Sequence, residues 1–222
     1  MKYIWWWLED IFYGLKTLIH SQIYRAYHPA FNKSSPGKNA VIVIPGIWQT
    51  WNVFRDVINF LSEKGYSVYT VKGLKRNLVS VEQAAQLVRK TIEQNNLADV
   101  TLIAHSKGGL VGKYYLAFLN QNNKVKKLIA LSTPFNGSTL AKSFPVDFHK
   151  EIIPDSRLLQ TLSFHKEVNN KIVSIYPKWD NKIKPLESCV LPGAKNIQVR
   201  AYGHQKILFR NETEQVILNE LK

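Results

Sequence analysis

The sequence predicts an α/β fold, with a mostly parallel central sheet of about six strands, helices on both faces and an N-terminal amphipathic helix before it. Two observations carry this prediction. From residue 40 onward, short apolar runs alternate with segments of helical periodicity. The chain also has 222 residues, 45% of them hydrophobic, so it can bury one sizeable core and disorder is not expected.

Short apolar runs mark the central ones of the expected strands. Residues 40–44 are apolar throughout, as is typical of a buried central strand in a parallel sheet. A second run of this kind, 100–104, is interrupted by one threonine. The full set of expected strands is 40–44, 67–71, 100–104, 127–131, 172–176 and 197–201.

Helical periodicity marks the segments that alternate with these runs. Between residues 50 and 63, Val53, Val57 and Phe60 recur at helical spacing, and Gly65 ends the helix. The expected helices are 50–63, 81–94, 110–119 and 212–221.

Residues 1–30 form a separate, aromatic-rich segment. Its apolar run, residues 3–8, contains three consecutive tryptophans and is too short for a membrane span or a signal-peptide core. Tryptophans at the edge of an apolar helix face fit a water–lipid boundary. We expect contact with a membrane surface, with packing on the domain's own core or in a dimer as the alternatives. The apolar face of the expected helix consists of Ile4, Leu8, Ile11, Leu15 and Leu18.

Turn-forming residues divide the chain further. Residues 31–39 are expected to link the N-terminal helix to a folded domain, residues 40–222. Within this domain, residues 132–168 interrupt the alternation with several prolines. A long connection after a strand often acts as a lid or a substrate wall, so a lid-like insertion is expected here, and a plain structural insertion is the alternative.

The net charge of +14 indicates either a lysine-rich surface or attraction to an anionic membrane. The basic residues are dispersed and no nucleic-acid motif occurs, so nucleic acid is not an expected partner. The single cysteine, Cys189, fits a reducing compartment, so we expect a cytoplasmic location. Peripheral attachment to the membrane from the cytoplasm is the alternative. No metal or other cofactor is expected, because no Cys/His cluster has the spacing of metal ligands. The oligomeric state stays open.

Ser106 lies between an expected strand and the helix that starts directly after it, in the segment Ala104-His105-Ser106-Lys107-Gly108. A strand-to-helix turn this tight needs small residues two positions before and after the serine, and Ala104 and Gly108 meet that need. The serine would project above the sheet edge as a nucleophile, with the helix N-terminus behind it. The alternative is a serine that only caps a helix.

Residues 104–109 resemble the nucleophile elbow of the lipase and esterase branch of α/β hydrolases. Small bacterial lipases also carry alanine before the His-Ser pair, although glycine is usual at the position of Ala104. The resemblance extends over residues 40–221 and implies an α/β-hydrolase fold. It also implies a serine hydrolase whose acid and histidine follow the serine in that order.

The resemblance further implies an oxyanion hole made of two backbone N–H groups. The turn that starts at Pro45 corresponds to the His-Gly-X turn of these lipases, with Pro45 in place of the histidine. The two donors would be the amides of Ile47 and Lys107.

Three aromatic residues are candidates for substrate contact. Residues 133–138 resemble the Thr-Pro-X-X-Gly-Ser segment that shapes the acyl pocket in lipases, which makes Phe135 a candidate. Trp48 and Trp51 follow the oxyanion turn and could line an apolar acyl site. Ordinary packing at a helix start is the alternative for both.

The expected general base is His204, because it follows the strand 197–201 directly before the last helix. The other histidines after Ser106, His149 and His165, fall in the irregular insertion. The expected acid is Asp180, in a loop after the strand 172–176 that resembles the family's Asp-X-hydrophobic-Pro loop with one extra residue. Asp155 and Glu187 are the reserves.

A Ser106–Asp180–His204 triad predicts cleavage of carboxylic esters or lipids through an acyl-enzyme. Residues 171–210 hold eight Lys/Arg against two Asp/Glu, which favours an anionic or lipid-headgroup substrate if these residues face the pocket. Two alternatives remain. One is an acyltransferase or thioesterase with the same triad, and the other is a catalytically silent, membrane-associated module with this fold.

Overall fold

The computed structural model describes residues 2–23, 39–143 and 150–222. These residues form one six-stranded sheet in the order β2-β1-β3-β4-β5-β6, and every pair of neighbouring strands is parallel. The sheet confirms the expected α/β architecture. Its strands are β1 (Val41–Ile44), β2 (Val68–Thr70), β3 (Val100–His105), β4 (Val125–Leu131), β5 (Ile172–Trp179) and β6 (Lys195–Tyr202).

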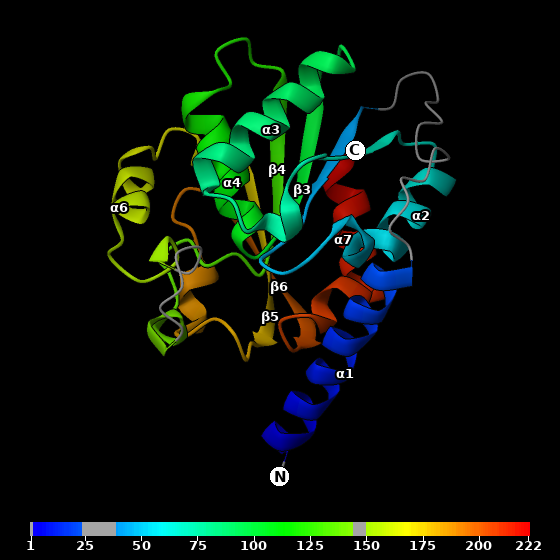
Figure 1. Cartoon of the computed structure of the whole chain (residues 1–222), viewed down its shortest axis with the longest axis vertical. Helices are drawn as coiled ribbons and strands as arrows, with labels where there is room; N and C mark the ends of the chain where they lie inside the picture. The colour runs from blue at the N-terminus through cyan, green and yellow to red at the C-terminus, as the bar shows by residue number, and fades with distance from the viewer. Residues whose placement is uncertain (1, 24–38, 144–149) are drawn as a thin grey trace.

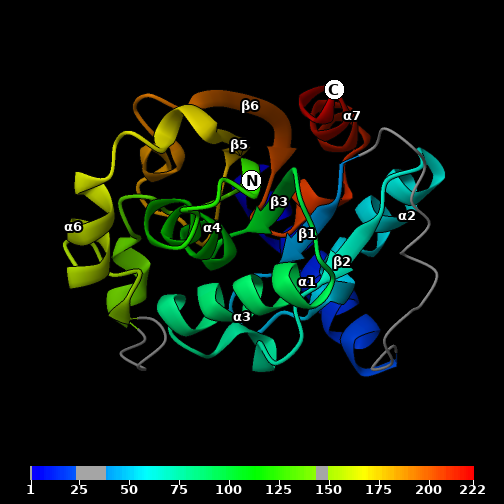
Figure 2. The ribbon, with the colours of Figure 1, turned by 90° about the horizontal axis from the view of Figure 1, so that it is seen from above.

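Helices cover both faces of the sheet (Figure 2). One face packs against α3 (Val81–Gln94), α4 (Lys107–Phe118) and α6 (Arg157–Phe164), and the other against α2 (Arg55–Glu63) and α7 (Asn211–Leu221). Every residue of β1 and β3 is buried, which explains why these two strands are the most apolar runs of the sequence. All six parallel strands therefore end at one edge, where the residues that follow them can meet.

The helix boundaries differ from the expected ones mainly near the sheet edge. The segment 50–63 is a short 3-10 helix, η2 (Trp51–Phe54), followed directly by α2. The helix α4 begins at Lys107 rather than at residue 110, because the two glycines of its first turn add no apolar periodicity. The expected insertion contains η4 (Thr139–Ser143) and α6, while residues 144–149 lie outside the described part of the chain. Most of the expected linker, residues 31–38, lies outside it as well.

The N-terminal helix α1 (Lys2–Ile23) runs along the lower side of the molecule in Figure 1, beside the carboxyl ends of the strands. It packs against η2 and against the short helix η7 (Lys206–Phe209) that follows β6. Trp6 stacks on Tyr202 with ring centroids 4.2 Å apart, and Tyr13 stacks on Phe209 at 4.9 Å. None of the helices in residues 2–23, 39–143 and 150–222 combines the length and apolarity needed to cross a membrane.

The face of α1 that docks on the domain is not the apolar one. Among residues 3–19 of this helix, Asp10 and Thr17 are the most buried, with 2% and 7% exposure. The apolar residues that the sequence places on one face of this helix point away from the domain instead. The exposed fraction is 37% for Ile11 and 46–63% for the other four, Ile4, Leu8, Leu15 and Leu18.

Candidate active site

Ser106 occupies the sharp turn between the end of β3 and the start of α4. Its backbone has φ 54° and ψ −125°, a conformation that costs energy for a residue with a side chain and that is often found at functional sites. The turn is held from two sides. The N–H of Ser106 donates to the carbonyl of Leu131 at 2.9 Å, and a Cβ at Gly108 would overlap the carbonyl oxygen of Ile44. The sequence thus produces a strained, partly exposed serine at the sheet edge.

The turn after β1 lies beside this serine. A Cβ built on Gly46 would be 3.0 Å from Cβ of Ser106, so the two loops are in contact. The N–H of Gln49 donates to the carbonyl of Gly46 at 3.2 Å, and the N–H of Gly46 donates to Oε1 of Gln49 at 2.7 Å. Between them, Trp48 has a φ of 62°, which a residue with a side chain rarely adopts. Ile47 therefore lies at the tip of a tightly closed turn next to Ser106.

Lys107, the other expected oxyanion donor, is the first residue of α4. A first-turn N–H has no acceptor within its own helix, so this amide is oriented toward the space in front of the helix. The position of the preceding turn also depends on Asn77, whose Nδ2 donates to the carbonyl of Pro45 at 2.7 Å.

Asp180 and His204 form a hydrogen-bonded pair that nearly excludes water. Nδ1 of His204 lies 2.8 Å from Oδ2 of Asp180, and the two residues are 4% and 1% exposed. The other carboxylate oxygen of Asp180 accepts hydrogen bonds from the N–H groups of Lys182 and Ile183 at 2.7 and 2.9 Å. The N–H of His204 donates to Oδ1 of Asn181 at 3.2 Å. The loop after β5 therefore fixes both the carboxylate and the backbone of the histidine.

The electrostatics of this pair favour an ionised carboxylate. Burial on its own would raise the pKa of Asp180, but the charge and hydrogen bond of His204 and the two backbone N–H groups hold that pKa below its ordinary value. A carboxylate beside Nδ1 selects the ring tautomer in which Nδ1 carries the proton, and leaves Nε2 as a free base.

His105 supports the site from below. It is fully buried, its ring centroid is 4.7 Å from that of His204, and its Nε2 lies 2.9 Å from the carbonyl oxygen of His204. Its Nδ1 lies 2.9 Å from Oε1 of Gln49. Burial and the neighbouring His204 lower the pKa of His105 to about 3, so the ring is neutral and only one of its two contacts is a hydrogen bond at a time. His105, the residue before Ser106, thus contacts both the His204 loop and the oxyanion turn.

The side chain of Lys107 ties the insertion to the elbow. Its Nζ donates to the carbonyl of Val79 at 2.7 Å and lies 2.9 Å from Oε2 of Glu151. The carboxylate of Glu151 also accepts the N–H of Val81, at 3.0 and 3.1 Å. Burial lowers the pKa of Lys107, and Glu151 opposes this shift. The described part of the insertion is therefore anchored directly behind the nucleophile.

The three aromatic candidates for substrate contact lie in different environments. Trp48 is 49% exposed beside the oxyanion turn, and Trp51 is partly buried at the start of η2. Phe135 is only 6% exposed and belongs to the apolar cluster beneath α4 and α6. A role in substrate binding stays a prediction for all three.

The alternative acid and base residues are not brought to the site. Asp155 and Glu187 are exposed, and the ring of His165 contacts Glu167 and Phe118 instead. His149 lies outside the described residues. Three residues that were not predicted from the sequence support the site: Gln49 contacts His105, Asn181 accepts the N–H of His204, and Asp10 accepts the N–H groups of Gln205 and Lys206.

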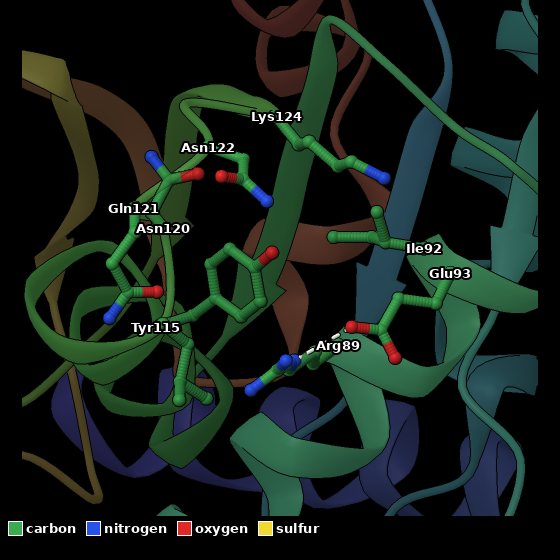
Figure 3. Close-up of a pocket in the computed structure, with 9 residues that line it drawn as sticks. Arg89, Ile92, Glu93, Tyr115, Asn120, Gln121, Asn122 and Lys124 are labelled. Atoms are coloured by element: carbon green, nitrogen blue, oxygen red, sulfur yellow. Dashed lines mark hydrogen bonds and ion pairs between the residues drawn. The ribbon is translucent and has the colours of Figure 1, made fainter.

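A small pocket lies far from these residues, between the C-terminal ends of α3 and α4 (Figure 3). The side chains of Tyr115, Asn120 and Lys124 surround it, and Nε of Arg89 pairs with Oε1 of Glu93 at 2.7 Å on one side. These segments join the amino ends of the strands, opposite the edge that carries Ser106. Within the described residues, no group of three or more His, Cys, Asp or Glu is placed to hold a metal ion.

A protein-family model and a known protein sequence each match more than half of the chain. A family model described as palmitoyl protein thioesterase matches residues 40–179, which is more than half of the chain. The match includes Ser106 and ends one residue before Asp180. Triacylglycerol lipase 2 of Saccharomyces cerevisiae is 28% identical over 138 residues, which are 58% of this chain and 40% of the yeast protein. The chain therefore spans less than half the length of that relative.

Solved structures resemble the whole fold. Lipase B of Aspergillus fumigatus superposes with a TM-score of 0.75 and 17% identity, over 87% of this chain and 55% of that one. The mature lipase BlEst2 of Bacillus licheniformis gives a TM-score of 0.64 and 17% identity, over 85% of this chain and 94% of that one. A monoacylglycerol lipase of Paleococcus ferrophilus gives a TM-score of 0.60 and 16% identity. At such identities the likeness establishes the fold, and it leaves the substrate open.

Proposed function

Because the chain belongs to the palmitoyl protein thioesterase family and has the α/β-hydrolase fold of lipases and esterases, we propose that it is a serine hydrolase that cleaves carboxylic esters of acyl chains. One observation carries the proposal. The strained serine of an elbow lies at the same sheet edge as a buried Asp–His pair, joined to it through the contacts of His105. Ser106, Asp180 and His204 would form the triad.

In the proposed reaction, Oγ of Ser106 attacks the ester carbonyl while Nε2 of His204 takes the hydroxyl proton. The resulting imidazolium donates to Asp180, whose carboxylate compensates its charge. When the tetrahedral intermediate collapses, His204 returns the proton to the departing alcohol and the acyl group stays on Ser106. Water then attacks the acyl-enzyme with His204 again as the base, which releases the acid and restores the serine.

The amides of Ile47 and Lys107 are the proposed donors to the oxyanion. The closed turn from Gly46 to Gln49 lies against Ser106, and the N-terminus of α4 presents its positive end at the same place. Both donors are backbone groups, so the proline at position 45 is compatible with the mechanism, and the alanine at position 104 meets the elbow's need for a small residue.

The proposal is tested with a soluble 4-nitrophenyl ester and a fluorophosphonate probe. Ser106→Ala should abolish both ester cleavage and labelling, whereas Ser163→Ala, which changes an exposed serine of α6, should leave both unchanged. Full ester hydrolysis by Ser106→Ala would reject the proposed nucleophile. A folded wild-type protein that neither cleaves esters nor reacts with the probe would favour the catalytically silent module.

A thioesterase is the second candidate, and the family match favours it. The first half-reaction is the same for an oxygen ester and a thioester, so the triad does not separate them. The discriminating measurement is kcat/KM for an oxygen ester and for a thioester of N-acetylcysteamine with the same acyl chain. A large preference for the thioester would assign the activity to this candidate. Product formation with an added alcohol acceptor would instead indicate an acyltransferase.

We further propose that the outward face of α1 binds an anionic lipid surface. Its apolar side chains remain exposed although the helix is docked on the domain, and Trp5, Trp7 and Phe12 add to them with exposures of 72%, 50% and 64%. Basic residues lie beside its N-terminal half. Trp6 and Tyr3 contact the ring of Trp179. Nζ of Lys184 lies 5.4 Å from the centre of the same ring, and Lys182 belongs to the same loop as Lys184. An apolar helix face flanked by cations fits an anionic bilayer.

Vesicle binding tests this surface. A triple variant Trp5→Ser/Phe12→Ser/Leu15→Ser should lose co-sedimentation with vesicles of phosphatidylcholine and phosphatidylglycerol, and keep its activity on the soluble ester. Phe164→Ser is a matched control, because Phe164 is 82% exposed on α6 at a distant place. Unchanged binding of the triple variant would reject the lipid surface. A wild-type dimer that the triple variant breaks would show that a second copy covers this face instead.

A further inference from the structure

Asp10 of the N-terminal helix contacts the loop that carries His204. Its Oδ1 accepts hydrogen bonds from the N–H groups of Gln205 and Lys206, at 2.6 and 3.0 Å, and the residue is 2% exposed. These two amides open the short helix η7, so a carboxylate from a distant segment caps it. The backbone directly after His204 is therefore fixed by α1.

Gly203 makes this contact possible. Its φ of 143° suits glycine, and a Cβ at this position would overlap Oδ1 of Asp10 and lie 2.8 Å from its Cβ. The carboxylate thus lies directly against the backbone on the other side of His204. Asp10 contacts the residues before and after the histidine, while Asp180 contacts its ring.

Gln205 also contacts the oxyanion turn. Nε2 of Gln49 donates to Oε1 of Gln205 at 2.7 Å, and Oε1 of Gln49 accepts the N–H of Gly46. A shift of Gln205 would therefore move the residue that closes the turn beside Ser106. Through Gln205, Asp10 is connected to both halves of the site.

We propose that Asp10 is a positioning residue, which holds the His204 loop and, through Gln205 and Gln49, the oxyanion turn in the geometry for catalysis. The proposal rests on the proposed serine hydrolase function. It makes α1 part of the active site's support, with one face on the His204 loop and the other exposed. The two hydrogen bonds of Asp10 also explain why this carboxylate is buried in the docked face of the helix.

The test compares three variants of the full chain. Asp10→Ala removes the acceptor, and Asp10→Asn keeps an oxygen at the position of Oδ1. Glu9→Ala is the matched control, since it removes the neighbouring carboxylate, which pairs only with the side chain of Lys206 within the described contacts. The number of folded sites is counted from the end point of fluorophosphonate labelling, and kcat and KM on a soluble ester are then given per site.

Asp10→Ala should lower kcat on the order of 10- to 100-fold and leave KM nearly unchanged, because the reacting groups are misplaced rather than the ester site lost. Asp10→Asn should restore most of kcat, and Glu9→Ala should resemble the wild type. A normal kcat per site in Asp10→Ala, or an equal loss in Glu9→Ala, would overturn the proposal. A loss in Asp10→Asn as large as in Asp10→Ala would also overturn it, since charge rather than the two hydrogen bonds would then matter.

Amide hydrogen exchange supplies a readout that is independent of catalysis. In Asp10→Ala, the amides of Gln205 and Lys206 should exchange faster, because both lose their acceptor, and in Glu9→Ala they should not. Unchanged exchange would reject the positioning role whatever the activity. Faster exchange in a protein without hydrolase activity would leave the contact standing and reject the proposed function alone.

Discussion

Nδ1 of His204 lies 2.8 Å from Oδ2 of Asp180, and the second oxygen of this carboxylate is held by two backbone N–H groups. Such an arrangement fixes the ring of the histidine and compensates the charge that it acquires when it takes a proton. The role of Asp180 can therefore be tested without changing its shape.

Asp180→Asn should lower kcat for ester hydrolysis by about 10⁴-fold, since an amide can present an N–H to Nδ1 and stabilise the wrong tautomer. Glu187→Gln is the control, because it alters an exposed carboxylate shortly after the same loop. Steady-state kinetics on the soluble ester measure both. If Asp180→Asn keeps more than about a tenth of kcat, the loss is far smaller than the expected one. That result would argue against Asp180 as the acid.

The close contact between α4 and β1 leads to a prediction on stability. A Cβ at Gly108 would overlap the carbonyl oxygen of Ile44 and lie 2.9 Å from that of Pro45, and both are backbone atoms at the end of β1 and in the turn after it. Gly108→Ala should therefore lower the free energy of unfolding by about 3 kcal/mol. Gly14→Ala in α1 is the matched change, because its Cβ would meet only Cγ of Gln205 at 4.0 Å.

Gly14→Ala should leave stability unchanged or raise it by about 0.5–1 kcal/mol, as expected for a helix interior. Urea denaturation of both variants measures the difference. A Gly108→Ala protein as stable as the wild type would show that the elbow does not need this close approach.

The ion pair behind the nucleophile gives a third prediction. The side chain of Lys107 is fully buried, and Glu151 supplies its opposite charge. Glu151→Gln keeps an oxygen for the N–H of Val81 but leaves a buried ammonium unpaired, which should cost about 3 kcal/mol in the free energy of unfolding. The double variant Lys107→Met/Glu151→Gln should recover most of this loss, because no buried charge remains.

Chemical denaturation of the single and double variants tests the pair. Since the amide of Lys107 is retained in both, ester hydrolysis per folded site should change little. A double variant that is less stable than Glu151→Gln would contradict the assignment of the cost to an unpaired charge.

The sequence was sufficient for the sheet and for the residues at its edge, for a physical reason. The central strands β1 and β3 are buried along their whole length and almost entirely apolar, so these runs mark strands, and the residue after each run lies at a known edge. The strand ends were less predictable. β5 continues to Trp179 through Pro177, which is paired with Val199, and through Lys178, where the register with β6 shifts, although the composition is not that of a buried strand.

The support of the site could not be predicted in this way. Asp10 and Gln205 are 195 positions apart, and Gln49 and Gln205 are 156 apart, so no local pattern connects them. The periodicity of residues 2–23 predicted a helix whose apolar face contacts a membrane, with packing on the domain as the alternative. It did not indicate that the opposite face would dock. A carboxylate and aromatic rings of that face dock because the segment after β6 offers N–H groups and ring faces.

Lys113 gives the last prediction, on the pH dependence of stability. Its side chain is buried in α4, and burial lowers the pKa to about 8 from an ordinary value of 10.5. Between these two values the unfolded state binds more protons than the folded state, so the contribution of Lys113 makes the protein more stable as the pH rises from about 8 to about 10.5. Lys113→Met removes the buried charge and should stabilise the protein at pH 7 by about 2 kcal/mol.

The advantage of Lys113→Met over the wild type should shrink at pH 9.5, where the lysine of the folded protein is neutral. Lys90→Met, at an exposed position of α3, should show neither effect. Urea denaturation at pH 7 and pH 9.5 measures both comparisons. An advantage that is equal at the two pH values would mean that the gain comes from apolar packing of the methionine, and that Lys113 is not held in a buried site that disfavours its charge.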